Sequence, residues 1–398
     1  MGLRRLFRKL FFPGVPTRGC WESSYVIRSF TFQDKETFFG CYDKSPESAD
    51  GRYVLYHAVN PPSFQLPLPE EIAHIVVFDQ WDDQVVMDVS TTSFNWQQGA
   101  RAMWVSADRF LFNDYNASDD RYVSRLFSVK EKKLIRTYDR PVYDVCGKLA
   151  VSLSFERLQQ MRPEYGYRDR EGKVSGLEEE YKDGIFLMDM QNGASHLFLS
   201  LARIKEVLPL PTMEGARHWV NHLMMSPGGD QLIFLHRWKK SGKVFHRLLH
   251  STLPEAAPRV LADGIISHAC WDGDHHIICY CTFEGMPGSY YRFDLRDGSR
   301  KVPGDVIPEP YGDGHPSVLG EWMLMDSYPD RRRVKHLLMR NLQTGEERVL
   351  GRFFDPRKFF GPSRCDLHPR WSPDGRRVYF DSVHQGRRRL YSICLDES

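Results

Sequence analysis

Several signatures of common protein classes are missing from this sequence. None of its 398 residues belongs to a run of roughly 18 apolar residues, the length that a membrane-spanning helix needs. The eight cysteines are scattered singly apart from one Cys-x-Cys pair, and no Cys-x-x-Cys pair occurs, which suits a reducing compartment better than a disulfide framework. The formal net charge is only +2, so we expect no basic surface for nucleic acid.

The N-terminal segment lacks acidic residues and also lacks the separate apolar region of a secretion signal, so we expect a cytoplasmic protein. We predict that residues 1–20 form a basic amphipathic extension, which contacts the inner face of a membrane through residues 1–12. A frayed terminus, or a helix packed against the domain, explains the same pattern. The apolar face of such a helix would consist of Leu3, Leu6, Phe7 and Leu10, and the basic face of Arg4, Arg5, Arg8 and Lys9.

Short apolar runs between turn-forming residues dominate the rest of the chain. The 25 Phe, 18 Tyr and 9 Trp favour strands over long helices. The clearest pattern lies at 368–395, where Ser372-Pro373-Asp374-Gly375 joins two strands and a third strand follows. Similar segments recur at 44–59, 104–115, 142–155, 221–238, 270–281 and 317–328. Seven copies with about four strands each predict an all-β fold, a seven-bladed β-propeller of four-stranded blades.

The two ends of this repeat array predict how the ring closes. The last copy stops after three strands, and the strand-like residues 24–30 precede the first copy. We expect this N-terminal strand to complete the last blade, which leaves no open sheet edge. Residues 21–398 then form a single domain. One insertion, 157–183, interrupts the third blade, and we predict that it lies over the channel, because unstructured loops of more than about 15 residues are usually functional or disordered.

Four histidines stand at the same position of successive copies. His222, His268, His315 and His368 are 46, 47 and 53 residues apart, close to the length of one blade. This position begins the innermost strand of a blade, so the four imidazoles should meet at one end of the channel. The same register places a basic residue in each of the other three copies, namely Lys44, Arg101 and Arg140.

This layout favours a site for a metal ion and an anionic ligand. Clustered imidazoles bind Mn, Zn, Fe or Ni, and a carboxylate such as Asp326 or Asp381 can orient the rings. Arginine and lysine can hold an anionic sugar, and a base and an acid could then cleave it by β-elimination. We predict His222 as the base and Tyr165 or Tyr167 as the acid. The predicted substrate-binding residues are Lys44, Arg101, Arg140, Arg162, Arg168, His236 and Arg237.

Each of these histidines also has a structural explanation. A single buried histidine is more often a satisfied polar residue than a catalytic group, and a repeat can preserve a hydrogen bond between blades. The tryptophans three residues after two of them, Trp271 and Trp371, are expected to pack between blades.

The repeats resemble the Pro-Asp-Gly propeller repeats of the Tol-type and oligogalacturonate-lyase-type proteins over nearly the whole chain. RCDLHPRWSPDG at 364–375 is similar to the segment that supplies metal ligands in oligogalacturonate lyases, where the pattern is Gln-x-x-His-x-His. Here Ser363 and Asp366 occupy the first two places, and His368 matches the third. The resemblance, combined with the in-phase histidines, implies a divalent metal, with manganese as a candidate. Its predicted ligands are His268, His315, His368 and Asp366.

We therefore expect a carbohydrate-active enzyme, a metal-assisted lyase that acts on a uronate-containing oligo- or polysaccharide. A glycan hydrolase that uses the same face is the near alternative. A non-catalytic propeller that binds glycan or protein in polysaccharide biosynthesis is the alternative of a different class. The pattern predicts no oligomeric state.

Overall fold

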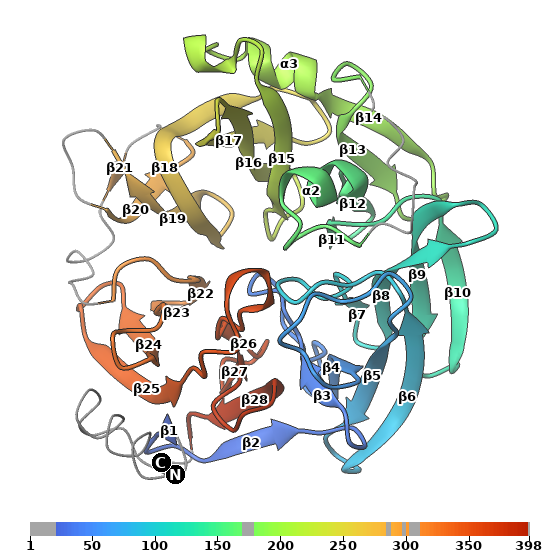
Figure 1. Ribbon diagram of the computed structural model, residues 1–398, viewed down its shortest axis with the longest axis vertical. Coiled ribbons are helices and arrows are strands. Elements are labelled where there is room, and N and C mark those ends of the chain that lie inside the picture. Colours follow the sequence, from blue (N-terminus) through green and yellow to red (C-terminus); the bar gives the residue numbers. More distant parts are fainter. Residues whose placement is uncertain (1–20, 169–178, 284–287, 297–299, 302–310, 397–398) are drawn as a thin grey trace.

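A computed structural model describes residues 21–168, 179–283, 288–296, 300–301 and 311–396. Antiparallel sheets follow one another around a central axis and form a β-propeller (Figure 1). Within the described residues, no helix is long and apolar enough to cross a membrane. The predicted N-terminal extension, residues 1–20, lies outside the described residues, and so does 169–178 of the predicted insertion.

The strands group into sheets in the order of the chain. The first sheet consists of β3 (Glu36–Phe38), β4 (Tyr53–Val59), β5 (Ala73–Asp79) and β6 (Gln84–Thr91). The second consists of β7 (Met103–Ser106), β8 (Arg109–Asn116), β9 (Arg121–Ser128) and β10 (Lys133–Tyr138). The third consists of β11 (Asp144–Cys146), β12 (Leu149–Ser152), β13 (Gly184–Asp189) and β14 (Ser195–Ser200).

The remaining strands form three further sheets. The largest has seven strands, β15 (Arg217–Met225), β16 (Gln231–Lys240), β17 (Lys243–Thr252), β18 (Arg259–Asp272), β19 (His276–Thr282), β20 (Ser289–Asp294) and β21 (Arg300–Lys301). The next contains β22 (Ser317–Leu319), β23 (Trp322–Asp326), β24 (Val334–Asn341), β25 (Glu347–Phe354) and β1 (Trp21–Glu22). The last contains β26 (Arg370–Trp371), β27 (Arg377–Ser382), β28 (Arg389–Cys394) and β2 (Ile27–Phe30).

The structure corrects the predicted number of blades. Six hydrogen-bonded sheets surround the axis, where seven separate four-stranded blades were expected. The difference arises at β18, whose first part pairs with β17 and whose second part pairs with β19. One long strand therefore joins two repeat copies in a single seven-stranded sheet.

The predicted closure by an N-terminal strand is confirmed. β2 pairs antiparallel with β28, with Ile27 opposite Ile393 and Phe30 opposite Leu390. A second N-terminal strand, β1, adds to β25 of the neighbouring sheet. These pairings cover two sheet edges that would otherwise be open.

Turn chemistry and tryptophans explain how the repeat folds. At the clearest turn, the Ser372 hydroxyl donates to Asp374 (2.6 Å), and Gly375 takes a left-handed φ of 73°, which glycine adopts without steric cost. Three tryptophans at one repeat position, Trp104, Trp271 and Trp371, donate their indole N–H to a main-chain carbonyl of the preceding copy. The accepting residues are Pro46, Met224 and Ser317. Trp271 and Trp371 therefore lie between successive copies, as predicted.

The helices are short and lie in the connections. α2 (Phe155–Met161) begins the predicted insertion, and its N-cap Ser154 accepts from the Arg157 N–H. α3 (Leu201–Glu206) is capped in the same way by Ser200. Two 3-10 turns complete the inventory of described helices, η1 (Pro211–Met213) and η2 (Gly361–Ser363).

Candidate functional site

The four in-phase histidines come together, and three of them surround Tyr42. The ring centroids of His268 and His315 lie 3.9 Å apart, those of His315 and His368 4.2 Å, and those of His222 and His268 6.1 Å. The Tyr42 ring lies 5.2–5.9 Å from His268, His315 and His368. All four histidines are buried. Residues that are widely separated in sequence thus form one cluster of imidazoles.

Two of these histidines have a left-handed backbone conformation. His222 has a φ of 50° and His368 a φ of 47°, and the basic residue at the same repeat position in the second sheet, Arg101, has a φ of 51°. Non-glycine residues seldom adopt this left-handed conformation, which costs roughly 1–3 kcal/mol and concentrates at functional sites. His268 lies in an irregularity of β18 between Ile266 and Ala269. The repeat therefore interrupts regular strand pairing where the imidazoles meet.

Asp326 fixes the orientation of His315. Its Oδ1 accepts from His315 Nδ1 (2.9 Å) and from the His315 main-chain N–H (2.7 Å), and its Oδ2 accepts from the His368 main-chain N–H (3.0 Å). Burial lowers the pKa of His315, but the neighbouring carboxylates of Asp326, Asp366 and Asp313 together outweigh burial and raise this pKa above its usual value. With Nδ1 bound to Asp326, His315 Nε2 faces His368 Nε2 at 3.2 Å.

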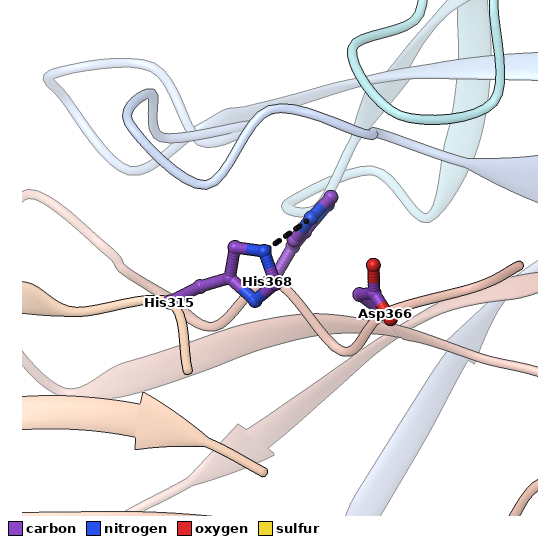
Figure 2. Close-up of side chains that lie close together, drawn as sticks. All are labelled: His315, Asp366 and His368. Atoms are coloured by element: carbon purple, nitrogen blue, oxygen red, sulfur yellow. Dashed lines mark hydrogen bonds between the residues drawn. The ribbon is translucent and has the colours of Figure 1, made fainter. Parts of the chain in front are cut away.

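The donor atoms of His315, His368 and Asp366 lie within 4.8 Å of one another, close enough to share one cation. The planes of the two rings are 79° apart. Figure 2 shows the hydrogen bond that joins them, with Asp366 beside the rings on the segment that leads to His368. Two nitrogens at about 2.1 Å from one ion lie roughly 3.0–3.4 Å apart, so the 3.2 Å separation of the Nε2 atoms fits a metal site. The carboxylate behind His315 provides the outer contact that metal-binding histidines usually have.

Asp366 already has cationic partners. Arg364 Nε donates to one of its oxygens (2.6 Å), and Lys335 Nζ lies 3.5 Å from the other. Burial raises the pKa of Asp366, but these two charges outweigh burial and hold the pKa well below its usual range. Asp366 is therefore an anion that a metal would share with Arg364 and Lys335.

His268 is held from the opposite side. Its Nδ1 lies 3.1 Å from the Ser267 hydroxyl and 3.4 Å from Asp313, and the Ser267 hydroxyl donates to Asp313 (2.6 Å). No hydrogen bond to the described residues involves the Nε2 of His268, so this atom can bind a ligand. Sequence analysis missed Asp313 and Tyr42, although Gly312-Asp313-Gly314 directly precedes His315 and Tyr42 stands two residues before Lys44.

His222 lies at the edge of the cluster and differs from the other three. Its ring contacts Tyr165 edge-on at 5.3 Å, and no hydrogen bond to the described residues engages either ring nitrogen. Burial, followed by the charge of Arg237, lowers the pKa of His222 well below its usual value. His222 is therefore a neutral imidazole with a free lone pair.

Arg237 is a buried cation without an anion. Its side chain is 6% exposed, its Nε has no hydrogen-bond partner, and no ion pair joins it to a carboxylate of the described residues. Burial and the charge of Arg162 lower its pKa to about 10. A buried unpaired charge is costly, so an anionic ligand that binds here would gain strongly from neutralising it.

Two other predicted basic residues have protein partners instead. Arg101 forms two 3.0 Å bonds with Asp43, and Lys44 lies 2.6 Å from Asp144. Asp43 directly precedes Lys44, and Asp144 is the first residue of β11. These two carboxylates neutralise Arg101 and Lys44, which were expected to be available to an anionic ligand. Arg140 packs over the Phe186 ring at 3.6 Å. All three side chains predicted to bind substrate therefore already have partners within the protein.

Three more of the predicted residues, His236, Asp381 and Tyr167, have partners within the protein. His236 is buried between His218 (2.8 Å) and Arg247 (3.0 Å), and Asp381 binds Arg370 (2.9 Å) rather than a histidine. Tyr167 is stacked on Phe155 with ring centroids 4.4 Å apart, and its hydroxyl accepts from Asn113 (2.8 Å). These residues have structural partners that account for them.

Part of the predicted insertion does reach the site. The Tyr165 hydroxyl accepts from Arg364 (3.3 Å), which links it to Asp366, while Arg162 is bound to Glu164 (2.6 Å). The main-chain carbonyl of Arg168 accepts from Tyr122 (3.5 Å) at the last described residue before the gap. Of the two predicted acids, Tyr165 is therefore the one beside the histidines.

Comparison with known proteins identifies the fold. No family model matches the chain, and no curated protein matches its sequence. Among solved structures, it is similar to an oligogalacturonate lyase in complex with manganese, with a TM-score of 0.63 and 14% identity over 94% of both chains. It is also similar to an oligogalacturonate lyase from Vibrio parahaemolyticus, with a TM-score of 0.57 and 13% identity over 94% of this chain and 96% of that chain. TolB from Acinetobacter baumannii gives a TM-score of 0.43 and 13% identity over 88% of this chain and 82% of that chain. The chain thus has a β-propeller fold similar to that of the oligogalacturonate lyases.

Proposed function

We propose that this protein is a metal-assisted lyase that cleaves a uronate-containing oligo- or polysaccharide by β-elimination at the histidine cluster. The observation that carries the proposal is the pairing of a neutral, unbonded imidazole, His222, with a buried arginine that has no anionic partner in the described structure, Arg237. The fold shared with oligogalacturonate lyases supports the same class of substrate.

The chemistry of elimination uses both residues. The uronate carboxylate binds Arg237, which withdraws charge and acidifies the proton on the neighbouring sugar carbon. His222 Nε2 or Nδ1 takes that proton, the C–H electron pair becomes the new C=C bond, and the C–O bond to the leaving sugar breaks. Tyr165 is the candidate that protonates the leaving oxygen, because its ring contacts His222 and its hydroxyl is held by Arg364.

His268, His315, His368 and Asp366 are the residues that would hold the metal. A bound divalent ion such as Mn²⁺ would add Lewis-acid neutralisation of the substrate carboxylate. Asp326 keeps the proton of His315 on Nδ1, so that Nε2 faces the shared position. Tyr42 contacts three of these imidazoles and limits how far their rings can move.

The test is turnover of uronate oligosaccharides, followed by the ultraviolet absorbance of the unsaturated product. We expect His222→Gln to lower the rate about 10²–10⁴-fold, as loss of a general base does. Arg237→Gln should raise KM and lower kcat, because the carboxylate loses its partner. Arg140→Gln is the matched control, since Arg140 packs on Phe186, and it should keep the activity. An active His222→Gln variant would contradict the assignment of the base.

A binding function without catalysis is the second candidate, and two observations favour it. All four histidines are buried, and Asp366 is neutralised by Arg364 and Lys335. A glycan-binding propeller would bind uronate oligosaccharides in calorimetry without forming product, and Arg237→Gln would weaken that binding. Release of new reducing ends without the unsaturated product would identify a hydrolase instead.

A further inference from the structure

One edge of the ring exposes aliphatic side chains from three separate segments. Leu208 (67% exposed) and Leu210 (36%) follow α3, Val244 (40%) follows the β16–β17 turn, and Ile265 (63%) lies in the middle of β18. Single exposed aliphatic residues are common, but three that line one groove, with Leu208 two residues before one of them, mark an interaction surface. We call this surface the β16–β17 edge, and it is the upper part of the ring in Figure 1.

The groove at the centre of this edge is apolar. It has a volume of about 550 Å³, and Leu210, Val244 and Ile265 contribute to its lining. Trp238 and Phe245 stack beneath it with their ring planes 10° apart and their centroids 5.6 Å apart. The Trp238 indole N–H is satisfied by Thr212 (3.1 Å). The polar side chains that also line the groove are Thr212, His246, Asp263 and Thr282.

Basic residues surround the same groove. Lys239 and Lys243 are exposed at the β16–β17 turn, and Arg217 is exposed opposite Lys239 on β15. No ion pair joins these three to a carboxylate within the described ranges. The exposed acids on the same segments are Glu206, Glu214 and Asp263, and Glu206 is already bound by Arg203 (3.0 Å). Among the described residues of this edge, the three cations exceed the two unpaired acids, Glu214 and Asp263, so it combines protruding aliphatic chains with a small excess of positive charge.

We propose that the β16–β17 edge binds the surface of an anionic lipid bilayer. The four aliphatic side chains would enter the interfacial region, while Lys239, Lys243 and Arg217 would contact headgroup phosphates. The charge complementarity favours this occupant over a second copy of the chain, whose matching edge would carry the same positive charge. The proposal depends neither on lyase activity nor on residues 1–12.

The β16–β17 edge lies close to the histidine cluster, because both include residues of β18. His268 follows Ile265 by three residues on β18, so the membrane-binding edge lies roughly 10 Å along one strand from the histidine cluster. Binding through this edge would hold the histidine end of the channel close to the lipid surface. A saccharide attached to that surface would then reach the site more readily than one in bulk solution.

The test is co-sedimentation of the full chain with vesicles of phosphatidylcholine alone or mixed with phosphatidylserine. We expect binding to the mixed vesicles that falls with added salt. Lys239→Gln with Lys243→Gln should lower the partition coefficient about 25-fold, since each lysine contributes about a factor of five. Leu208→Ser with Ile265→Ser should also lower it, and unchanged circular dichroism would verify folding.

The matched control carries Lys132→Gln and Leu134→Ser, exposed residues at the β9–β10 turn. It should bind vesicles as the unchanged chain does. The proposal is overturned if the unchanged chain binds neither kind of vesicle or binds both equally. It is also overturned if deletion of residues 1–12 abolishes binding while the edge variants bind normally, because the N-terminal segment would then be the membrane contact.

Discussion

Acid should destabilise this protein through a histidine that lies outside the candidate site. His57 on β4 is completely buried, and its two ring nitrogens have different partners. Nε2 accepts from the Ala100 main-chain N–H (2.9 Å), and Nδ1 lies 3.3 Å from the Phe38 carbonyl. This arrangement requires a neutral ring with its proton on Nδ1. Burial lowers the pKa of His57 to about 4.

The size of the effect follows from proton linkage. In the unfolded chain the pKa of His57 is about 6.5, so the unfolded state gains a proton below that pH while the folded state stays neutral down to about pH 4. The stability that His57 contributes is therefore complete above pH 6.5 and is lost as the pH falls towards 4. Between pH 7 and pH 5 the free energy of unfolding should drop by about 2 kcal/mol from this one residue.

Urea unfolding at both pH values measures this drop. His57→Gln removes the titrating group, so the difference in unfolding free energy between pH 7 and pH 5 should shrink by about 2 kcal/mol relative to the unchanged chain. His196→Gln, at an exposed histidine on β14, is the control and should leave the difference unchanged. Equal pH dependence of the His57→Gln variant and the unchanged chain would refute the argument.

Three further perturbations test the packing and the candidate metal site. Gly99→Ala would place a Cβ against the buried His57 ring and should therefore lower the melting temperature. Gly147→Ala is the control, because Gly147 has the same φ of 58° but open space around it, and its melting temperature should fall far less. Asp326→Asn should weaken Mn²⁺ or Zn²⁺ binding about 10–100-fold in titration calorimetry, because the orientation of His315 is lost; unchanged affinity would argue against the metal site. Trp271→Phe should cost about 1 kcal/mol in chemical unfolding, the usual value of one hydrogen bond.

The fold could be predicted because its signal repeats. Each Ser-Pro-Asp-Gly type of turn marks two antiparallel strands, and seven such turns at regular spacing leave few architectures other than a ring. The spacing gives no information on hydrogen bonds between copies. β18 runs without a break from Arg259 to Asp272, and nothing in that segment distinguishes a shared strand from two separate ones. The number of continuous sheets was therefore not predictable.

The sequence predicted where the four histidines meet, but it could not predict which of the basic residues are paired with a carboxylate. The phase of His222, His268, His315 and His368 indicated that their side chains would meet, since residues in phase lie at one end of the channel. Whether a basic residue is free depends on neighbours from other sheets. Asp144 on β11 neutralises Lys44, which lies between β3 and β4, and no spacing rule connects the two. No ion pair joins Arg237 to a carboxylate of the described residues, and its role in substrate binding stays a prediction.

The closure of the ring has a consequence for the order of assembly during synthesis. β2 precedes its partner strand β28 by more than 350 residues. At roughly 5–20 residues per second, a ribosome needs roughly 20–70 seconds to cover that distance. Throughout this interval Ile27 to Phe30 have no partner strand, although Phe30 can pack on Tyr56 and Phe78 of the first sheet. The first sheet also lacks its neighbour on one side. We infer that the nascent chain completes the ring last, when β28, the last of the described strands, pairs with β2.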